Sequence, residues 1–271
     1  MALYGVIADI HGNREALAAA LAALDARGVR RLACLGDIIG YNADPDECAA
    51  MLRSRDVLAI AGNHDLIGLG RLDTRRCSNN ARYALQRTRR TLGPGTRAWL
   101  ATLPASRVLE ERVVLVHGGV RDVQQYMATP ALVAHNAALL REDFPGARLC
   151  FFGHSHEQKI YEVDGDAVEE IPLREREKFA FRRDRTYFVN PGSVDAARKS
   201  RHKLAECAIL DPGAGAIEFL RVPYDAASSE VKALVFGYRI TPWADRLYSF
   251  QRRLRRAASR LRPFNRTACG R

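Results

Sequence analysis

Short apolar runs alternate with helical patterns in the first part of the chain, and this alternation restricts the fold more than any other feature. The runs at 3–8, 32–35 and 57–61 have the length and the Leu, Ile and Val content of buried strands. An amphipathic helical pattern that ends at Arg27 separates the first two runs, and a helix that begins at Pro45 separates the next two. This β-α-β-α-β order predicts a mostly parallel sheet with right-handed crossovers.

The second half of the chain has the pattern of a largely antiparallel set of strands. Two apolar runs flank a helical pattern at about 130–141, and two hairpins follow, the first around the turn signal Asp164-Gly165. The expected strands are 113–116, 148–152, 159–163, 167–171, 204–210 and 216–222. A parallel first half and an antiparallel second half predict an α/β fold with two sheets packed face to face and helices outside.

Two stretches fall outside this pattern. Residues 66–111 are polar, rich in arginine and expected to be helical in part, and residues 174–185 are mixed in charge, which predicts an exposed loop. No repeat or low-complexity linker divides the chain. We therefore expect one domain over residues 1–223 and an appended, basic, helical C-terminal tail over residues 224–271.

The net charge of +11 is concentrated in this tail. Residues 231–271 contain 11 Lys and Arg and a single acidic residue, Asp245. The rest of the chain is nearly neutral, because it contains the other 31 of the 42 basic residues and 30 of the 31 acidic ones. Apolar residues from Leu247 to Leu261 recur at nearly helical spacing among the arginines. Such a helix suits nucleic acid or an anionic membrane surface. The interpretation favoured by the pattern alone is a helix that docks by its apolar stripe, with its arginines in solvent.

The sequence lacks the features of membrane and secreted proteins. No apolar run approaches the roughly 18 residues that a membrane span requires. The start has no basic region, and Asp9 comes too early for a signal peptide. The six cysteines are scattered, with no Cys-x-x-Cys pair, which predicts reduced, partly buried thiols. We expect a soluble, cytoplasmic protein.

Residues of the kinds that bind metals gather at the predicted strand ends. Five of the seven histidines closely follow apolar runs, as do two aspartates and an asparagine. These residues are Asp9, His11, Asp37, Asn63, His64, His117, His154 and His156. In open α/β folds ligands bind at the carboxyl ends of strands. One histidine at a strand end is more often structural, but chance rarely places five of seven there.

The donor set restricts the metal. Mixed nitrogen and oxygen donors suit Mn, Fe(II), Zn or Ni and argue against an all-oxygen calcium site. Seven donors exceed what one catalytic zinc with an open position needs, but they are enough for two metals that share a bridging carboxylate. We therefore expect two divalent ions, with Mn²⁺ as the ion to supply in vitro.

The order of these motifs resembles the calcineurin-like metallophosphoesterase superfamily. The strings ADIHGN, LGDIIGY and NPGSV (190–194) are similar to its small bacterial phosphodiesterase branch, and the resemblance covers residues 3 to about 195. It implies a four-layer α/β/β/α sandwich of two mixed sheets with flanking helices. It also implies hydrolysis of a phosphate ester, a diester more than a monoester, by hydroxide on a dinuclear metal centre.

The resemblance assigns each metal its ligands. The first metal is assigned to Asp9, His11 and His156, the second to Asn63, His117 and His154, and the bridge to Asp37.

The resemblance also implies residues that act on the substrate. His64 is the expected general acid for the leaving oxygen, a role typically worth about 10²–10⁴-fold in rate. Asp65 is expected to orient His64, with simple solvation as the alternative. Asn13, Tyr41 and Asn42 sit in loops that should line the pocket, although their residue types also suit turns.

One departure from the family pattern narrows the substrate. Phosphoprotein phosphatases and dinucleoside tetraphosphatases continue the second motif as Gly-Asp-x-Val-Asp-Arg-Gly, whereas this chain reads Gly36-Asp-Ile-Ile-Gly-Tyr-Asn42. The second Asp and the substrate Arg are missing, so we expect a different small phosphate ester or nucleotide. A nuclease that holds nucleic acid with its basic tail and a non-catalytic metal-binding scaffold are the alternatives. The complete donor set argues against the scaffold, and no pattern predicts the oligomeric state.

Overall fold

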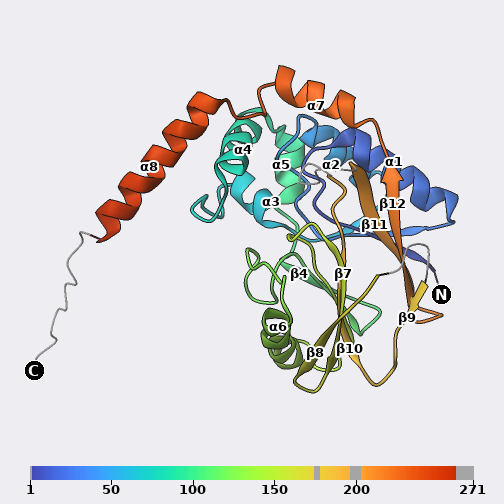
Figure 1. Cartoon of the computed structure of the whole chain (residues 1–271). Coiled ribbons are helices and arrows are strands. Elements are labelled where there is room, and N and C mark those ends of the chain that lie inside the picture. Colours follow the sequence, from blue (N-terminus) through green and yellow to red (C-terminus); the bar gives the residue numbers. More distant parts are fainter. Residues whose placement is uncertain (1, 174–177, 196–202, 261–271) are drawn as a thin grey trace, which may run out of the picture.

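Two six-stranded sheets form the centre of the computed structural model, which describes residues 2–173, 178–195 and 203–260 (Figure 1). The strand orders are β3-β2-β1-β11-β12-β9 and β4-β5-β6-β10-β7-β8. The first sheet contains β1 (Tyr4–Ile7), β2 (Arg31–Cys34), β3 (Leu58–Ala59), β9 (Lys178–Ala180), β11 (Leu204–Asp211) and β12 (Ala216–Pro223). The second contains β4 (Ser106–Leu109), β5 (Val113–Val116), β6 (Leu149–Phe151), β7 (Gln158–Asp164), β8 (Ala167–Ile171) and β10 (Thr186–Pro191).

Both sheets are mixed, which confirms the predicted α/β fold. β1 pairs with β2 in parallel and with β11 antiparallel, so the parallel first part and the antiparallel last part of the chain share one sheet. In the second sheet β6 lies between the parallel strands β5 and β10, and β7 and β8 continue it antiparallel. The expected division into a parallel half and an antiparallel half was therefore too simple.

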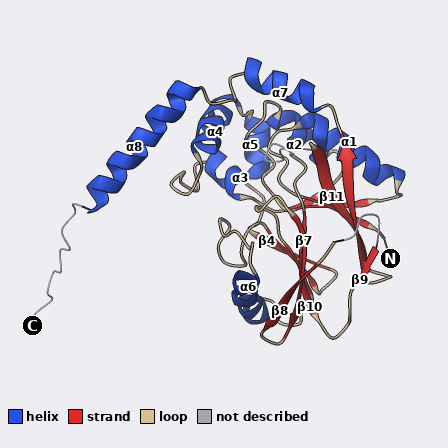
Figure 2. Cartoon of the chain, viewed as in Figure 1, coloured by secondary structure: helices blue, strands red, loops and turns tan. Residues whose placement is uncertain are grey.

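Helices cover the outer faces of the two sheets (Figure 2). α1 packs against the first sheet and α6 against the second. Asn13 is the N-cap residue of α1, and its side chain accepts a hydrogen bond from the Ala16 amide at 3.1 Å. The helices are α1 (Arg14–Ala26), α2 (Pro45–Arg53), α3 (Asn63–Gly68), α4 (Asn79–Thr91), α5 (Pro94–Leu100), α6 (Pro130–Asp143), α7 (Ala226–Val235) and α8 (Pro242–Arg260).

Alternation along the strands builds the layers. In β1, Val6 points into the core between the two sheets, where it joins Phe151 of β6, and Ile7 points to the opposite face, where it joins Leu17 of α1. A third cluster between the second sheet and α6 includes Val133. Three apolar layers thus separate four layers of structure, in the order helix, sheet, sheet and helix.

The stretch expected to be an exposed loop, 174–185, is in part a strand. Lys178–Ala180 forms β9 at the edge of the first sheet, and Phe179 and Phe181 pack against the core between the sheets. Their alternation was hidden by the surrounding charges. Residues 174–177 lie outside the described residues.

The five cysteines that the structure describes are free thiols. Four of them are buried, and burial raises the pKa of the Cys207 thiol to about 12. This agrees with the expectation of reduced thiols. Cys269 lies outside the described residues. None of the described helices combines the length and the apolar composition that a membrane span requires.

Both helices of the C-terminal segment contact the rest of the chain. Lys232 of α7 forms ion pairs with Glu15 of α1 and with Asp44. α8 leaves the body beside α4 and extends away from it (Figure 1). The division of the chain at residue 223 stays a prediction.

Candidate metal centre

Five loops bring the eight strand-end residues together. Asp9 and His11 follow β1, and Asp37 follows β2. The residues at 63–65 form the first turn of α3 after β3. His117 follows β5, and the residues at 154–156 follow β6. Both sheets therefore contribute to one place, and each of the eight side chains named from the sequence belongs to a residue that is at most 5% exposed.

Unusual backbone geometry marks the same residues. Eight described residues other than glycine have positive φ angles, and five of them are donors in the predicted set. Their φ angles are 54° at Asp9, 53° at His11, 53° at Asp37, 65° at His154 and 62° at His156. Left-handed backbone is costly for residues with a Cβ atom and concentrates at functional sites. Packing elsewhere in the protein holds these five side chains where ordinary strand ends would not place them.

The motif at 190–194 is one part of that packing. The Ser193 hydroxyl donates to the Asp9 carbonyl at 3.0 Å, and the Asp195 amide donates to the same carbonyl at 2.9 Å. The Asn190 side chain donates to the Gly153 carbonyl at 3.0 Å. This segment thus fixes the loop of Asp9 in one sheet and the loop of His154 in the other. The sequence offered the motif only as a resemblance, without this role.

A close contact between two loops also helps to hold the donor residues in place. A Cβ atom on Gly62 would lie 2.2 Å from both the amide nitrogen and Oδ1 of Asp37, so only glycine fits there. The His64 amide donates to the same Oδ1 at 2.7 Å. Asp37 is thereby held by the first turn of α3.

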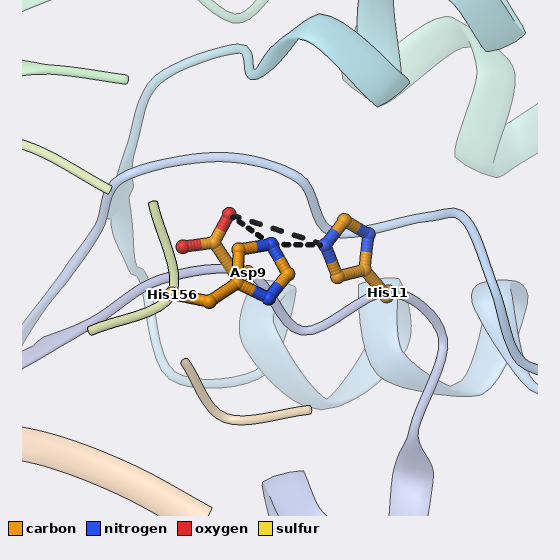
Figure 3. Close-up of side chains that lie close together, drawn as sticks. All are labelled: Asp9, His11 and His156. Atoms are coloured by element: carbon orange, nitrogen blue, oxygen red, sulfur yellow. Dashed lines mark hydrogen bonds and ion pairs between the residues drawn. The ribbon is translucent and has the colours of Figure 1, made fainter. Parts of the chain in front are cut away.

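Asp9, His11 and His156 form one candidate metal cluster (Figure 3). Asp9 Oδ1 lies 3.4 Å from His156 Nε2 and 3.9 Å from His11 Nε2, and the two imidazole nitrogens are 3.2 Å apart. The three donor atoms converge from the ends of β1 and β6. They are the residues assigned to the first metal.

Asp37, His117 and His154 form another candidate cluster. Asp37 Oδ2 lies 3.4 Å from His117 Nε2, and Asn63 Oδ1 lies 2.9 Å from the same nitrogen. The Asp37 oxygen is also 3.8 Å from His11 Nε2 of the first cluster. One carboxylate oxygen therefore lies between the two groups, which is the place that a bridging ligand needs.

The electrostatics favour an ionised Asp37. Burial by itself would raise the pKa of this carboxyl, but His117, His64 and His11 outweigh burial and hold its pKa well below the usual range. Burial would likewise lower the pKa of His117, but the Asp37 carboxylate raises it to about 9. The protein alone thus balances a buried negative charge with imidazoles.

The donor set fits divalent metal ions. Four donors are imidazoles, two are carboxylates and one is a carboxamide, the mixture that Mn, Fe, Zn and Ni accept. His117 Nδ1 lies 2.7 Å from the Leu35 carbonyl and His11 Nδ1 lies 3.4 Å from the Ile39 carbonyl, while their Nε2 atoms point into the clusters. A backbone partner on the other ring nitrogen is what orients histidine ligands in metal sites.

Asp65 lies beside the centre and holds its backbone. Its Oδ1 accepts from the Ile38 and Ile39 amides at 3.0 and 3.1 Å, and its Oδ2 accepts from the Gly62 amide at 2.9 Å. Burial and the charge of Asp37 raise the pKa of Asp65 to about 7. These contacts link the loop after β2 to the loop after β3. An orienting role toward His64 stays a prediction.

The three residues expected in the pocket differ in their surroundings. Asn13 donates to Asp195 Oδ1 at 2.9 Å and caps α1, and the Asn42 side chain donates to the His11 carbonyl at 3.3 Å. Tyr41 packs its ring against both His11 and His64, with centroids 4.6 and 4.9 Å apart. Their role in substrate binding stays a prediction, and the contacts show in addition that they shape the loop beside the centre.

The C-terminal segment also reaches this loop. The Arg239 guanidinium donates to the Tyr41 carbonyl at 2.9 Å and to Asn42 Oδ1 at 3.0 Å, while Glu230 accepts from its other side. Tyr238 is buried in a cluster with Tyr41. The basic composition of this segment did not indicate such a contact.

A pocket of about 120 Å³ opens next to the centre. Its lining includes Asn63, His64, His154 and Tyr41 together with residues that sequence analysis did not single out. These are Arg76, Cys77, Ser78, Ala81, Gln124 and Tyr126. Tyr126 lies against the His154 ring with centroids 4.0 Å apart. The arginine-rich character of 66–111 was the one available signal, and it did not distinguish Arg76 from its neighbours.

This fold and this cluster define a class: an α/β sandwich with a candidate multi-metal centre at the strand ends of both sheets. Comparison with known proteins agrees. The family model described as the calcineurin-like phosphoesterase superfamily domain matches residues 2–214. The chain therefore belongs to that superfamily, whose members hydrolyse phosphate esters and depend on divalent metals.

Relatives cover nearly the whole chain. Uncharacterized protein MJ0912 of Methanocaldococcus jannaschii is 30% identical over 254 residues, which are 91% of this chain and 97% of the relative. The chain matches the structure of a metallophosphoesterase from Sphaerobacter thermophilus with a TM-score of 0.73 and 28% sequence identity. The match covers 90% of this chain and 96% of the chain of that metallophosphoesterase. Hypothetical protein PH1004 from Pyrococcus horikoshii has a TM-score of 0.68 at 18% identity, with coverage of 91% and 97%, which shows a shared fold.

Gly40 provides a test of the packing around the centre. A Cβ atom there would lie 2.6 Å from Nδ1 of both His11 and His64, and φ at Gly40 is 154°. Gly40→Ala should therefore displace both rings and weaken Mn²⁺ binding by about 10–100-fold, as other disruptions of ligand orientation do. Isothermal titration of the metal-free protein measures this. Gly95→Ala is the matched control, because nothing lies within 4 Å of its Cβ position. Wild-type affinity in Gly40→Ala would contradict the account.

Proposed function

We propose that this phosphoesterase is a phosphodiesterase that acts with two divalent ions held by the seven donors. The observation that carries the proposal is the position of Asp37, whose Oδ2 lies between His11 and His117 of the two clusters. In this assignment the first ion takes Asp9, His11 and His156. The second takes Asn63, His117 and His154, and Asp37 bridges. When bound, such ions provide Lewis acidity toward phosphoryl oxygens and lower the pKa of a water.

The protein's own contribution is to hold these donors still. Burial keeps bulk water away from the clusters, so that each charge acts in a medium of low polarity. Left-handed backbone at five donors aims them at one region without any rearrangement. The substrate phosphate then meets a site whose charges are already in place.

His64 is the proposed proton donor to the leaving oxygen. Its amide is bonded to Asp37 and its ring lines the pocket. The ring also forms a candidate group with His11 and Asp37, although His64 is not one of the seven assigned donors. Nδ1 is buried on the side of Gly40. A proton held at Nε2 would be available to an alkoxide in the pocket, and the ring would take a new proton from water afterwards.

The charge of the pocket favours a diester over a monoester. A monoester dianion carries one more negative charge than a diester and needs an additional cation. Arg76 is the one Lys or Arg in the described lining, and its guanidinium is bonded to both oxygens of Asp122 at 3.0 and 2.8 Å. Its charge is thus already balanced. The arginine of the Gly-Asp-x-Val-Asp-Arg-Gly motif is also missing here.

The pocket has an aromatic wall that an ester can contact. Tyr41 and Tyr126 both line it. The larger part of an ester would extend past Tyr126, which is 45% exposed. A flat ring on the substrate could stack there.

Removal of the proposed proton donor should slow the reaction without loss of metal. We expect His64→Ala to lower kcat with Mn²⁺ by about 10²–10⁴-fold for a diester whose leaving group is an alkoxide, such as a dinucleoside phosphate. The effect on bis-p-nitrophenyl phosphate should be much smaller, because p-nitrophenolate leaves without protonation. The metal content should stay at the wild-type level. The exposed His135, replaced by Ala, is the matched control. A kcat within a few-fold of wild type for the alkoxide diester would remove His64 from the mechanism. Faster hydrolysis of p-nitrophenyl phosphate than of bis-p-nitrophenyl phosphate by the wild-type protein would overturn the diester assignment.

The aromatic wall predicts a change in KM and not in kcat. Tyr126→Ala should raise KM for the aryl diester by about two- to tenfold, the effect of losing one aromatic contact. Tyr126→Phe should retain the wild-type KM, because the ring and not the hydroxyl makes the contact. Steady-state kinetics at saturating Mn²⁺ separate the two constants. A fall in kcat with unchanged KM would show that Tyr126 acts in some other way.

A further inference from the structure

Exposed apolar side chains are concentrated in one short segment. Ten large apolar side chains are exposed among the described residues, and eight of them lie between residues 231 and 254. These eight are Val231, Leu234, Val235, Phe236, Trp243, Leu247, Phe250 and Leu254. An exposed apolar surface of this density marks a place where another surface binds.

The contacts of α8 with the body use its polar side. Asn79 of α4 donates to Asp245 Oδ1 and to the Ser249 hydroxyl, each at 2.9 Å. The Tyr248 hydroxyl donates to Gln86 at 2.5 Å. The Arg82 guanidinium lies 4.9 Å from the centre of the Tyr248 ring. The helix is thus attached by residues 245, 248 and 249.

The apolar stripe of α8 faces away from these contacts. Trp243, Leu247, Phe250 and Leu254 are spaced four, three and four residues apart, which places them on one side of a helix. Trp243 is 73% exposed, Phe250 59% and Leu254 53%. The expectation that α8 docks by its apolar stripe was therefore wrong, because α4 offers hydrogen-bonding and aromatic partners to the opposite side.

Arginines border the stripe. Arg246 and Arg253 are exposed. Each lies three residues after an apolar residue of the stripe, Trp243 and Phe250 respectively, which places both arginines at the border of the stripe on the helix surface. An apolar stripe with basic residues beside it, including a tryptophan, is the arrangement of helices that lie in the interface of an anionic bilayer.

A basic pocket lies beside α8. Arg87 and Arg90 of α4 line a hollow of about 290 Å³ together with Val235 and Phe236 at the end of α7. Its lining also includes Tyr83 and Gln86, two of the α4 residues that contact Tyr248 of α8. The described lining holds two arginines and no carboxylate, so it suits an anionic headgroup next to an apolar surface.

We propose that residues 231–254 dock the protein on the surface of an anionic phospholipid bilayer. The apolar stripe of α8 and the end of α7 would enter the interface, and Arg87, Arg90, Arg246 and Arg253 would meet lipid phosphates. This inference does not depend on the proposed function of the metal centre.

Two other occupants fit the observations less well. A second copy of the chain would bring two stripes together with like-charged arginines beside each, which costs energy at close range. Nucleic acid would bind the arginines, but exposed Leu247, Leu254 and Val235 have no base to stack on and would gain nothing. A bilayer surface satisfies the apolar and the basic residues at once.

Trp243 provides a direct readout. The chain has two tryptophans, and Trp99 is half-buried against the core, so a Trp99→Phe background leaves Trp243 as the single reporter. With vesicles of equal parts phosphatidylglycerol and phosphatidylcholine, we expect a blue shift of its emission and co-sedimentation of the protein. Vesicles of phosphatidylcholine alone should bind at least about tenfold less. Binding should weaken strongly at about 1 M salt, where the screening length is about 3 Å.

Matched variants separate the two components of the surface. Phe250→Ala together with Leu254→Ala should weaken vesicle binding by about tenfold or more through loss of buried apolar area. Arg246→Gln together with Arg253→Gln should weaken it by about tenfold or more through loss of charge. Val108→Ala removes an apolar side chain that is 47% exposed on β4 and should leave binding unchanged.

Three outcomes would overturn the proposal. One is equal binding to anionic and neutral vesicles, or no binding to either by a protein with wild-type circular dichroism. Another is a dimer in light scattering that Phe250→Ala and Leu254→Ala dissociate, without vesicle binding. The third is tight oligonucleotide binding that the arginine variants lose and the apolar variants retain, again without vesicle binding.

Discussion

Two buried carboxylates, those of Asp9 and Asp37, are the constraint on which the site depends. Each is at most 1% exposed, and an ionised carboxylate removed from water costs several kcal/mol unless partners compensate for it. The partners are imidazoles that follow four strands, β1, β3, β5 and β6, in two sheets. Neither sheet alone supplies them all. The face-to-face packing of the sheets therefore compensates for the cost of burying the carboxylates. The carboxylates in turn place the imidazoles.

The loops that carry these residues are fixed from several directions. Asp65 joins the loops after β2 and β3 through three backbone amides, and Ser193 joins the loop after β1 to the strand that ends at Pro191. Arg239 holds the loop of Tyr41 from outside. Such cross-bracing explains how five donors keep left-handed backbone angles. Arg239 also joins the C-terminal segment to the loop of Tyr41 beside the candidate metal centre. A surface that binds the C-terminal segment would therefore be separated from the centre only by this loop.

Sequence patterns predicted the parts of this structure that depend on local order. The helix at Pro45–Arg53 and the strand at Val113–Val116 occur as expected, because a proline at the helix start and a run of branched residues are local signals. The eight strand-end residues do converge in the fold. Strand pairing was not predicted, since the choice of β11 as the neighbour of β1 depends on contacts between residues about two hundred positions apart. Arg76 and Tyr126 were missed for the same reason. The orientation of α8 was wrong because its periodicity shows that a stripe exists and not which side is covered.

The central claim is that one chain holds two ions with Asp37 between them. Metal content after reloading with Mn²⁺ and removal of excess tests it most directly, measured by mass spectrometry of the ions together with protein concentration. We expect two ions per chain in the wild type, one in His156→Ala, and fewer than one in Asp37→Ala, because that residue contacts both clusters. Asp166→Ala, at a fully exposed turn, should retain both ions. A single ion per wild-type chain, or two ions in Asp37→Ala, would contradict the account.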